Sequence, residues 1–404
     1  MEKDVSPVQE SKRLIWIDAA RGFAIFGIFI VNIGGFGAPY FIHGGGELVW
    51  TSSIDQMAQW VIDVFFQASF YTLFSILFGF GFQILTERLR NRDVKPTPFI
   101  FRRLVILIGF GLIHAFAIWH GDILLTYGVI GLLLLLFLEV KPKTLLRWGI
   151  GLLVGCVGLI SFGLFVARES LGSVNDNAIT QALANYTSGS LVTIWSQNYQ
   201  DWLFGNEGIG YLLLATTLLP LFLFGMYLAQ KRWLHAPQQY RTRLFPMWVI
   251  SLVLFIGLKM GPYFVGNPLW FSYIQDNIGG TASAIFNIVS ITLLAQNNLG
   301  AKLIQPFIAV GRMSLTNYIL QSLFCFILFY GVGFGLYGHA NPTTSILIVV
   351  VVFIIEIMIS KWWFRHFLFG PLEWIWRSLM YLKWQPFRKK LEQKLKASFS
   401  NVRR

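Results

Sequence analysis

Apolar residues fall into ten long runs along the chain, separated by shorter polar segments. Each run is roughly 18 residues or longer, which is the length an α-helix needs to cross the hydrocarbon core of a bilayer. The runs lie within residues 14–34, 58–84, 103–119, 122–140, 148–167, 207–229, 245–265, 279–297, 303–331 and 343–363. The pattern predicts an all-α, polytopic membrane helix bundle with about ten transmembrane helices.

The composition and the charge distribution sharpen this prediction. Hydrophobic residues make up 55% of the 404 residues and charged residues only 13%, whereas about a quarter of the residues in a soluble domain are charged. If the N-terminus is cytoplasmic, all 32 lysines and arginines except Arg168 and Lys259 fall on the cytoplasmic side. Because basic residues collect in cytoplasmic loops, we expect a multi-pass protein of the cell membrane with both termini in the cytoplasm.

The same asymmetry bears on partners and domain organisation. The net charge of +13 is spread over all the inner loops, which favours contact with membrane lipids and not with nucleic acid. We expect residues 1–363 to form one transmembrane bundle, with a lid of short helices on the outer side at residues 168–206. Residues 364–404 are predicted to be a cytoplasmic, basic, amphipathic tail that lies against anionic headgroups.

Two histidines and an aspartate lie where the third run gives way to the fourth, in the segment GLIHAFAIWHGDILLTYG (residues 111–128). Ionisable groups at this depth are costly, so they indicate a functional site. If the segment turns as a helical hairpin, His114 and Asp122 can meet, while His120 lies at the turn and is expected to be exposed. The pair suits a general base and the group that orients it, although a structural pair or a proton relay uses the same residues. The spacing is not a recognised set of metal ligands, so we expect no metal.

The first run and the loop after it hold three further candidates. Arg21 and Asn32 are eleven residues apart, so they share one helix face and lie roughly 16 Å apart along it. His43 follows in a glycine-rich outer loop, where a neutral imidazole can act as a base. Arg21 can equally extend to the headgroups and Asn32 can bond a neighbouring helix.

Other polar residues lie near the predicted inner ends of the helices. Guanidinium groups bind phosphate in pairs, so some of these residues are candidates to hold an anionic nucleotide such as CoA, although arginines also collect there for topological reasons alone. The candidates are Arg21, Arg102, Arg103 and Arg312, together with the carboxamides Asn317 and Gln321, which share one helix face. Glu373 and Arg377, four residues apart, are expected to form an ion pair on one helix.

Several segments of this chain resemble a known family of bacterial membrane proteins, the YeiB-like family. The segments are RLIWIDAARGFAIFGIFIVN, FYTLFSILFGFGFQ, RRLVILIGFGLIHAFAIWHGDILLTYG, VGRMSLTNYILQS and GPLEWIWR. The family is similar to the transmembrane acyltransferase superfamily, which includes heparan-glucosaminide N-acetyltransferase. The resemblance implies an acyl-CoA, with acetyl-CoA the first candidate, bound from the cytoplasm and an acceptor on the far side.

The resemblance implies different site residues, depending on whether the chain is compared with the acetyltransferase or with the YeiB-like pattern. The acetyltransferase has a similar arginine-glycine step, a helix that ends in valine-asparagine and a loop with a catalytic histidine, which match Arg21, Asn32 and His43. The YeiB-like pattern does not require a histidine in that loop, but it includes a histidine and an aspartate that match His114 and Asp122. Either His114 or His43 is therefore the candidate base.

The sequence leads to two functional hypotheses. In the first, the chain is an integral membrane acyltransferase that moves an acyl group from cytoplasmic acyl-CoA to a sugar, a lipid headgroup or an amine at the outer face, with a histidine as general base. In the second, it is a transporter or channel for a small solute or a lipid-like molecule, and the buried His and Asp residues line its pathway. The lack of a visible internal repeat favours the first.

Overall fold

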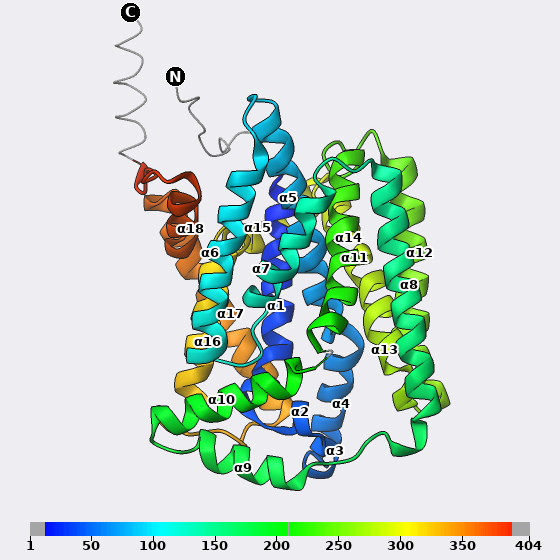
Figure 1. Ribbon diagram of the computed structural model, residues 1–404, viewed down its shortest axis with the longest axis vertical. Helices are drawn as coiled ribbons and strands as arrows, with labels where there is room; N and C mark the ends of the chain where they lie inside the picture. The colour runs from blue at the N-terminus through cyan, green and yellow to red at the C-terminus, as the bar shows by residue number, and fades with distance from the viewer. Residues whose placement is uncertain (1–12, 209, 390–404) are drawn as a thin grey trace, which may run out of the picture.

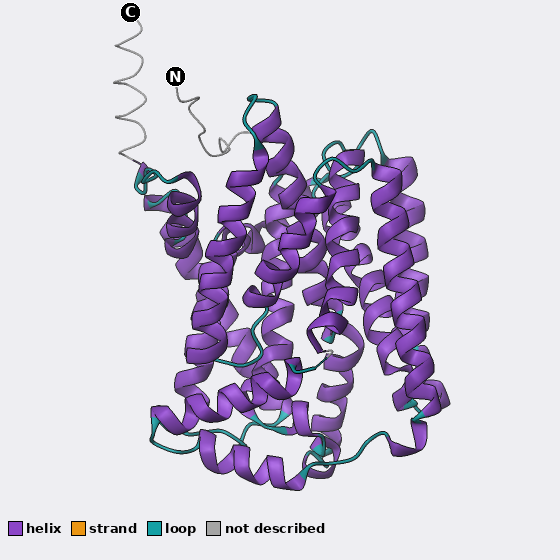
Figure 2. Ribbon diagram, viewed as in Figure 1, coloured by secondary structure: helices purple, strands orange, loops and turns teal. Residues whose placement is uncertain are grey.

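The computed structural model describes residues 13–208 and 210–389, and this part of the chain is helical, without a β-strand (Figure 2). Eight helices, or sets of helices that continue one another, are long and apolar enough to cross a membrane. They are α1 (Ile15–Gly37), the set α4 (Ser53–Val61), η2 (Ile62–Phe66) and α5 (Ser69–Arg90), α6 (Pro96–Ala117), α8 (Pro142–Val166), α11 (Gly210–Lys231), α12 (Arg241–Lys259) with η5 (Gly261–Val265), the set η6 (Leu269–Phe271), α13 (Ser272–Ile274), η7 (Gln275–Gly279) and α14 (Gly280–Leu294), and α17 (Pro342–His366). The predicted polytopic helix bundle is confirmed.

Two of the ten predicted runs do not form straight spanning helices. Residues 122–140 give α7 (Leu124–Leu132) and the 3-10 helix η3 (Leu133–Phe137), nine and five residues long. At about 1.5 Å per residue, this pair is shorter than the hydrocarbon core of about 30 Å. Residues 303–331 fall in α15 (Asn298–Arg312) and α16 (Ser314–Phe329), which meet at a bend of 80°. The described residues therefore contain eight spans, or nine if the bent pair is one span, where the sequence predicts about ten.

One end of the bundle carries basic connections and a short helix, and the opposite end is covered by several short helices (Figure 1). At one end lie the basic α5–α6 and α11–α12 connections and the short helix α18 (Pro371–Tyr381). Across the opposite end lie α2 (Tyr40–His43), α3 (Gly46–Val49), α9 (Asp176–Tyr186) and α10 (Leu191–Asn206), and η4 (Arg168–Ser170) precedes α9. The segment 168–206, for which the sequence suggests a lid, thus forms helices that cross one end of the bundle.

Glycines allow two pairs of helices to approach until their backbones touch. On α5 and α11, a Cβ atom at Gly79 would overlap the carbonyl of Phe222, and one at Gly225 would overlap the carbonyl of Ile76. On α1 and α15, Gly22 and Gly311 lie against the partner backbone in the same way. Small residues at such crossings let membrane helices gain van der Waals contact where lipid offers little hydrophobic driving force. These contacts fix the position of α1, which carries Arg21 and Asn32.

The end of the chain is described only in part. α17 ends at His366, and α18 then packs against α6 and α16, with the indole N–H of Trp376 donating to the carbonyl of Arg103 at 2.8 Å. Residues 390–404, the last part of the predicted basic amphipathic tail, lie outside the described residues. The prediction for that tail remains a prediction.

Candidate active site

His114 and Asp122 meet where α6 ends and α7 begins. The Nδ1 atom of His114 lies 2.8 Å from Oδ1 of Asp122, and both side chains are fully buried. The other carboxylate oxygen accepts a hydrogen bond from the backbone N–H of Leu125, one of the donors that the first turn of a helix leaves free. The start of α7 thus holds the carboxylate in front of the imidazole. The structure brings together the two residues that the sequence suggests as base and orienting group.

Ser322, on α16, contacts the other nitrogen of His114. Its Oγ atom lies 2.8 Å from Nε2 and 3.0 Å from the carbonyl oxygen of Tyr318, so its single proton can be donated to either acceptor. The three side chains are thus ordered carboxylate, imidazole, hydroxyl, as in the triads that activate serine nucleophiles, although the close Nδ1–Oδ1 contact does not have the direction of a hydrogen bond. Sequence reasoning did not single out Ser322, because a serine in an apolar helix usually bonds its own helix and carries no distinctive signal.

His43 lies in a second polar cluster, between α2 and α10. Its Nε2 atom is 3.6 Å from Oδ1 of Asp201, and both side chains are buried. Asp201 also accepts hydrogen bonds from the hydroxyl of Tyr186 at 2.7 Å and from the amide of Gln197 at 2.8 Å. The candidate bases therefore have different carboxylate partners, Asp122 for His114 and Asp201 for His43.

His120 belongs to this second cluster, and the expectation that it is exposed was wrong. Only 8% of its side chain is exposed, and Nδ1 lies 3.2 Å from the hydroxyl of Tyr186 and 3.8 Å from Oδ2 of Asp201. Burial lowers the pKa of His120 to about 4, although the charge of Asp201 opposes this shift. The reason for the difference is that α9 and α10 cover the turn that the sequence leaves at the surface. His120 is therefore neutral at neutral pH.

A cavity of about 270 Å³ extends into the bundle from the end where α18 lies. One part of its wall is basic, because six arginines from several elements face it, while the only carboxylates among its lining residues are Asp18 and Glu373. The arginines are Arg13, Arg21, Arg88, Arg103, Arg312 and Arg377. The remaining wall, from α1, α5, α6, α7 and α16, is mostly apolar. The cavity therefore offers a cationic end and an apolar end.

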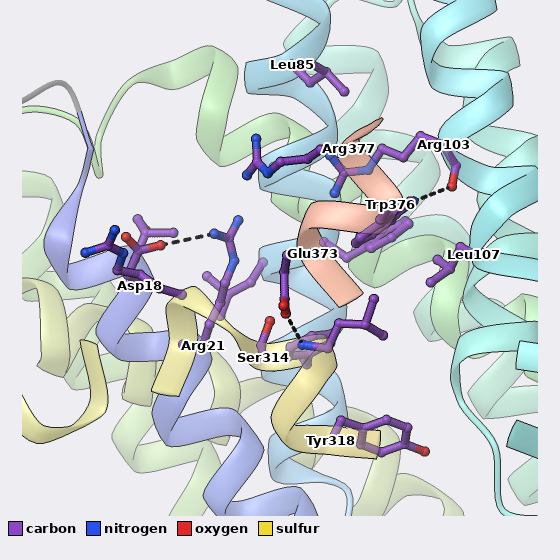
Figure 3. Close-up of a pocket in the computed structure, with 18 of the residues that line it drawn as sticks. Asp18, Arg21, Leu85, Arg103, Leu107, Ser314, Tyr318, Glu373, Trp376 and Arg377 are labelled. Atoms are coloured by element: carbon purple, nitrogen blue, oxygen red, sulfur yellow. Dashed lines mark hydrogen bonds and ion pairs between the residues drawn. The ribbon is translucent and has the colours of Figure 1, made fainter. Parts of the chain in front are cut away.

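Local contacts hold these guanidinium groups in place. Asp18 lies 2.9 Å from Arg13 and 3.3 Å from Arg21, and Arg103 stacks over the ring of Trp376. Arg377 stacks over Phe369 instead of pairing with Glu373, whose carboxylate bonds to α16. Burial lowers the pKa of Arg377 to about 10, with repulsion from Arg13 the next cause, so it remains charged at neutral pH. Figure 3 shows Arg21, Arg103 and Arg377 reaching this region from three different helices.

The apolar end of the cavity approaches His114 through one side chain. Tyr318, on α16, lines the cavity (Figure 3). Its ring centroid lies 5.0 Å from that of His114. Ile123 and Leu124, which directly follow Asp122, line the same end. His114, Asp122 and Ser322 are not among the lining residues of the cavity, so the ring of Tyr318 is the contact between the cavity and this set.

The remaining predicted residues lie in other surroundings. Arg102 is not among the lining residues of the cavity; its Nε atom donates to the carbonyl of Pro98 at 3.2 Å in an exposed position. Asn317 bonds to Ser360 at 3.2 Å, and Gln321 to Glu356 at 2.9 Å.

Asn32 is half-buried on α1, beside Ile33, which packs in the same cluster as Trp119 and Tyr186. Of the arginines proposed from sequence, Arg21, Arg103 and Arg312 line the cavity, whereas Arg13, Arg88 and Arg377 were missed. An arginine near the inner end of a helix fits the general excess of basic residues there, so the sequence does not distinguish the arginines that line the cavity from those that do not.

Nothing in the arrangement points to a resident metal. Within residues 13–208 and 210–389, no three His, Cys, Asp or Glu side chains are placed to hold a metal ion together. The expectation that the protein works without a metal remains a prediction.

Comparison with known proteins identifies the family. Uncharacterized protein YxaH of Bacillus subtilis is 37% identical over 96% of this chain and 98% of its own length. Uncharacterized protein YeiB of Escherichia coli is 30% identical over 91% of this chain and 96% of its own length. The chain belongs to the YeiB-like family. An uncharacterized 39.9 kDa protein of Bacillus acidopullulyticus is similar to it as well, 28% identical over 96% of this chain and 99% of the relative.

The matching family model is described as a protein of unknown function, DUF418, and covers residues 228–383. Within the YeiB-like chain, that region runs from the end of α11 beyond α18. It therefore includes Arg312, Ser322, Glu373 and Arg377, while His114 and Asp122 precede it. No solved structure matches the chain.

Proposed function

We propose that this membrane protein is an acyltransferase that takes an acyl group from acyl-CoA, with acetyl-CoA as the first candidate, and transfers it to a hydroxyl or an amine. The observation that carries the proposal is the single cavity that joins six arginines to Tyr318, the residue in contact with His114. An enzyme of this kind needs an anion-binding region and a proton acceptor near each other. The arginines of the cavity and the buried His114 beyond Tyr318, which come from different helices, are the candidates for these two parts.

The chemistry of the cavity suits the donor. The nucleotide part of CoA carries phosphates, and arginine binds phosphate with two parallel hydrogen bonds. The pantetheine arm and the acyl group are less polar, and they match the wall built from residues such as Leu77, Leu107 and Leu124. Bound in this way, the donor has its phosphates near α18 and its thioester toward Tyr318.

His114 has the environment that a general base requires. Asp122 faces Nδ1 and favours the tautomer with the proton on that atom, so that Nε2 can take the proton of the acceptor. As the acceptor attacks the thioester carbonyl, the carbon–sulfur bond breaks and the proton passes from His114 to the departing thiolate. The products are an ester or an amide and the free thiol of CoA.

The sequence adds the expected direction of transfer. The basic connections favour a cytoplasmic location for the end that carries α18, and we place the protein in the plasma membrane in this orientation. The donor then enters from the cytoplasm, and the acceptor reaches His114 from the end that α9 and α10 cover. A sugar, a lipid headgroup and a small amine are the acceptor classes to test.

One observation favours the rival hypothesis of a transporter. α15 and α16 meet at a bend of 80° inside the bundle, and broken helices form the substrate sites of many transporters. In this chain, however, the N-terminus of α16 is already bonded to the carboxylate of Glu373. The protein's own side chain thus occupies the position that an anionic cargo would take.

A CoA-release assay tests the proposal. Purified protein in nanodiscs is incubated with acetyl-CoA and a panel of sugars, phospholipids and amines, and the free thiol is followed with a thiol-reactive dye. We expect release that depends on an acceptor and falls by about 100-fold or more in His114→Gln, the usual range for a lost general base. The exposed residue His366 supplies the matched control, His366→Gln.

Binding is measured on the same samples through the rise in melting temperature on addition of CoA, which His114→Gln retains. Absence of both thiol release and a CoA-dependent shift in the wild type contradicts the proposal. In that case, uptake of solutes into proteoliposomes tests the rival.

A further inference from the structure

Three residues from three separate parts of the chain form one buried line of contacts. Asp122 lies in the α6–α7 connection, His114 on α6 and Ser322 on α16. The two contacts to the imidazole are both 2.8 Å, one on each nitrogen. The proposed function uses only the first two residues, so the role of Ser322 remains to be assigned.

Helix packing alone does not account for the position of Ser322. Its hydroxyl already has a partner on its own helix, the carbonyl of Tyr318 at 3.0 Å, which is enough to satisfy a serine in an apolar helix. The carboxylate of Asp122 and the imidazole of His114 are buried beside Ser322, and removing such groups from water costs free energy. The geometry resembles the arrangement in which a histidine removes the proton of a serine while a carboxylate fixes its tautomer.

We propose that Ser322 is a nucleophile that carries the acyl group between donor and acceptor, an inference that rests on the acyltransferase function proposed above. In the first half-reaction, the Ser322 hydroxyl turns its proton from the carbonyl of Tyr318 to Nε2 of His114, which takes it; the bond between Oγ and the acyl carbon forms, and the carbon–sulfur bond breaks. The proton then passes to the thiolate, so that free CoA leaves and an ester remains on Ser322. The positive charge formed on His114 is stabilised by Asp122.

The second half-reaction reverses these roles. The acceptor hydroxyl or amine gives its proton to Nε2 of His114 and attacks the ester carbon. The bond from that carbon to Oγ breaks, and Ser322 regains the proton. Atoms and charges balance over both steps without any further reactant.

The position of Ser322 on α16 fits such a relay. α16 begins at Ser314, which lines the cavity, and Tyr318 lines it one turn later. Ser322 lies four residues beyond Tyr318 on the same helix face, a rise of about 6 Å. Because Ser322 does not itself line the cavity, the relay requires the ring of Tyr318 to move aside for the acyl group, while the acceptor approaches from the side of α10. The covalent step therefore removes the need for both substrates to occupy the narrow interior together.

An exchange assay tests this inference without knowledge of the acceptor. Full-length protein is mixed with acetyl-CoA and isotopically labelled CoA, with no acceptor present, and label entering acetyl-CoA is measured. An acyl-enzyme route predicts exchange in the wild type, a fall of about 1,000-fold in Ser322→Ala, and transfer of labelled acetyl to the peptide that contains Ser322. The matched control is Ser251→Ala, because Ser251 is also buried and also bonds its own helix, at Trp248.

The outcomes separate this inference from the proposed function. If the wild type releases CoA to an acceptor and Ser322→Ala does so at the same rate while His114→Gln does not, transfer is direct and the role assigned to Ser322 is wrong. The same conclusion follows if the wild type turns over but shows neither exchange nor labelling. If the wild type does not release CoA at all, the proposed function itself fails.

A second variant guards against a loss of folding. Ser322→Cys keeps a nucleophile at the same position, and its thioester is cleaved by neutral hydroxylamine, whereas the wild-type ester resists this treatment. An acetyl label on Ser322→Cys that hydroxylamine removes supports the inference. A folded Ser322→Cys variant, checked by its melting temperature, that acquires no label contradicts it.

Discussion

Glu373, on α18, accepts a hydrogen bond from the backbone N–H of Thr316 at 3.1 Å. The same carboxylate accepts from the N–H of Leu315 at 2.7 Å and from the hydroxyl of Thr316 at 2.6 Å. These donors open α16 directly after the bend, where no preceding turn can satisfy them. Burial raises the pKa of Glu373, and the hydrogen bonds from Thr316 and Leu315 oppose this shift. A helix outside the spans thus stabilises the break between α15 and α16.

We expect Glu373→Ala to destabilise the protein by about 1–3 kcal/mol, because it leaves buried backbone donors without a partner. Glu373→Gln keeps an acceptor oxygen and should lose less. Both are measured by the melting temperature in detergent, against Glu47→Ala, which removes an exposed carboxylate. Equal melting temperatures for Glu373→Ala and Glu47→Ala would show that Glu373 does not stabilise the bend.

The crossing of α5 and α11 gives a second prediction. An added methyl group at Gly79 meets the backbone of Phe222, which cannot move independently of its helix. We expect Gly79→Ala to cost about 1–3 kcal/mol through overpacking. At Gly155, on α8, a Cβ meets nothing within 4 Å, so Gly155→Ala should leave the melting temperature unchanged or raise it slightly. The reverse order of the two variants would contradict the close contact.

The pKa of His120 predicts how stability depends on pH. In the unfolded chain this histidine takes up a proton below about pH 6.5, while in the folded protein it stays neutral until about pH 4. Its contribution is therefore constant above pH 6.5, and the folded state loses stability as the pH falls from 6.5 toward 4, by about 2 kcal/mol at pH 5. Melting temperatures at pH 7.5 and pH 5 should differ less in His120→Gln than in the wild type. His366→Gln, at an exposed position, should retain the wild-type difference.

Two adjacent arginines test the proposed donor site. Arg103 lines the cavity, whereas Arg102, also half-buried, does not. We expect Arg103→Ala to weaken CoA binding by roughly 10- to 100-fold, the value of one charge-assisted hydrogen bond, and Arg102→Ala to leave it nearly unchanged. The bond from Trp376 to Arg103 involves the backbone carbonyl, so it survives the substitution. Titration calorimetry gives both dissociation constants, and an equal loss in both variants would mean that only the general basic charge attracts the ligand.

Much of the fold could be predicted from sequence because membrane spans depend on length and apolarity, which are local properties. The positions of His114 and Asp122 were also predictable, since only eight residues separate them and a turn brings them together. The bend before Ser314 was not, because the groups that stabilise it come from Glu373, far along the chain.

The same limit applies to the polar residues. Ser322, Asp201 and Arg377 acquire their neighbours only through tertiary packing, and the residues around each in sequence give no sign of those neighbours. Periodicity and charge counts report on the helix to which a residue belongs and not on the helix that it will face. For this reason the base and its carboxylate could be proposed from sequence, but the hydroxyl beside them could not.

The contribution of α18 to the cavity wall has a consequence for the order of synthesis. Glu373, Trp376, Arg377 and Tyr381 line the cavity, yet they follow all the spans found within residues 13–208 and 210–389. A nascent chain that has emerged as far as α17 already contains each of these spans, but the wall of its cavity still lacks α18. Chains cut between α17 and α18 should therefore insert into the membrane and yet lack the complete ligand-binding wall.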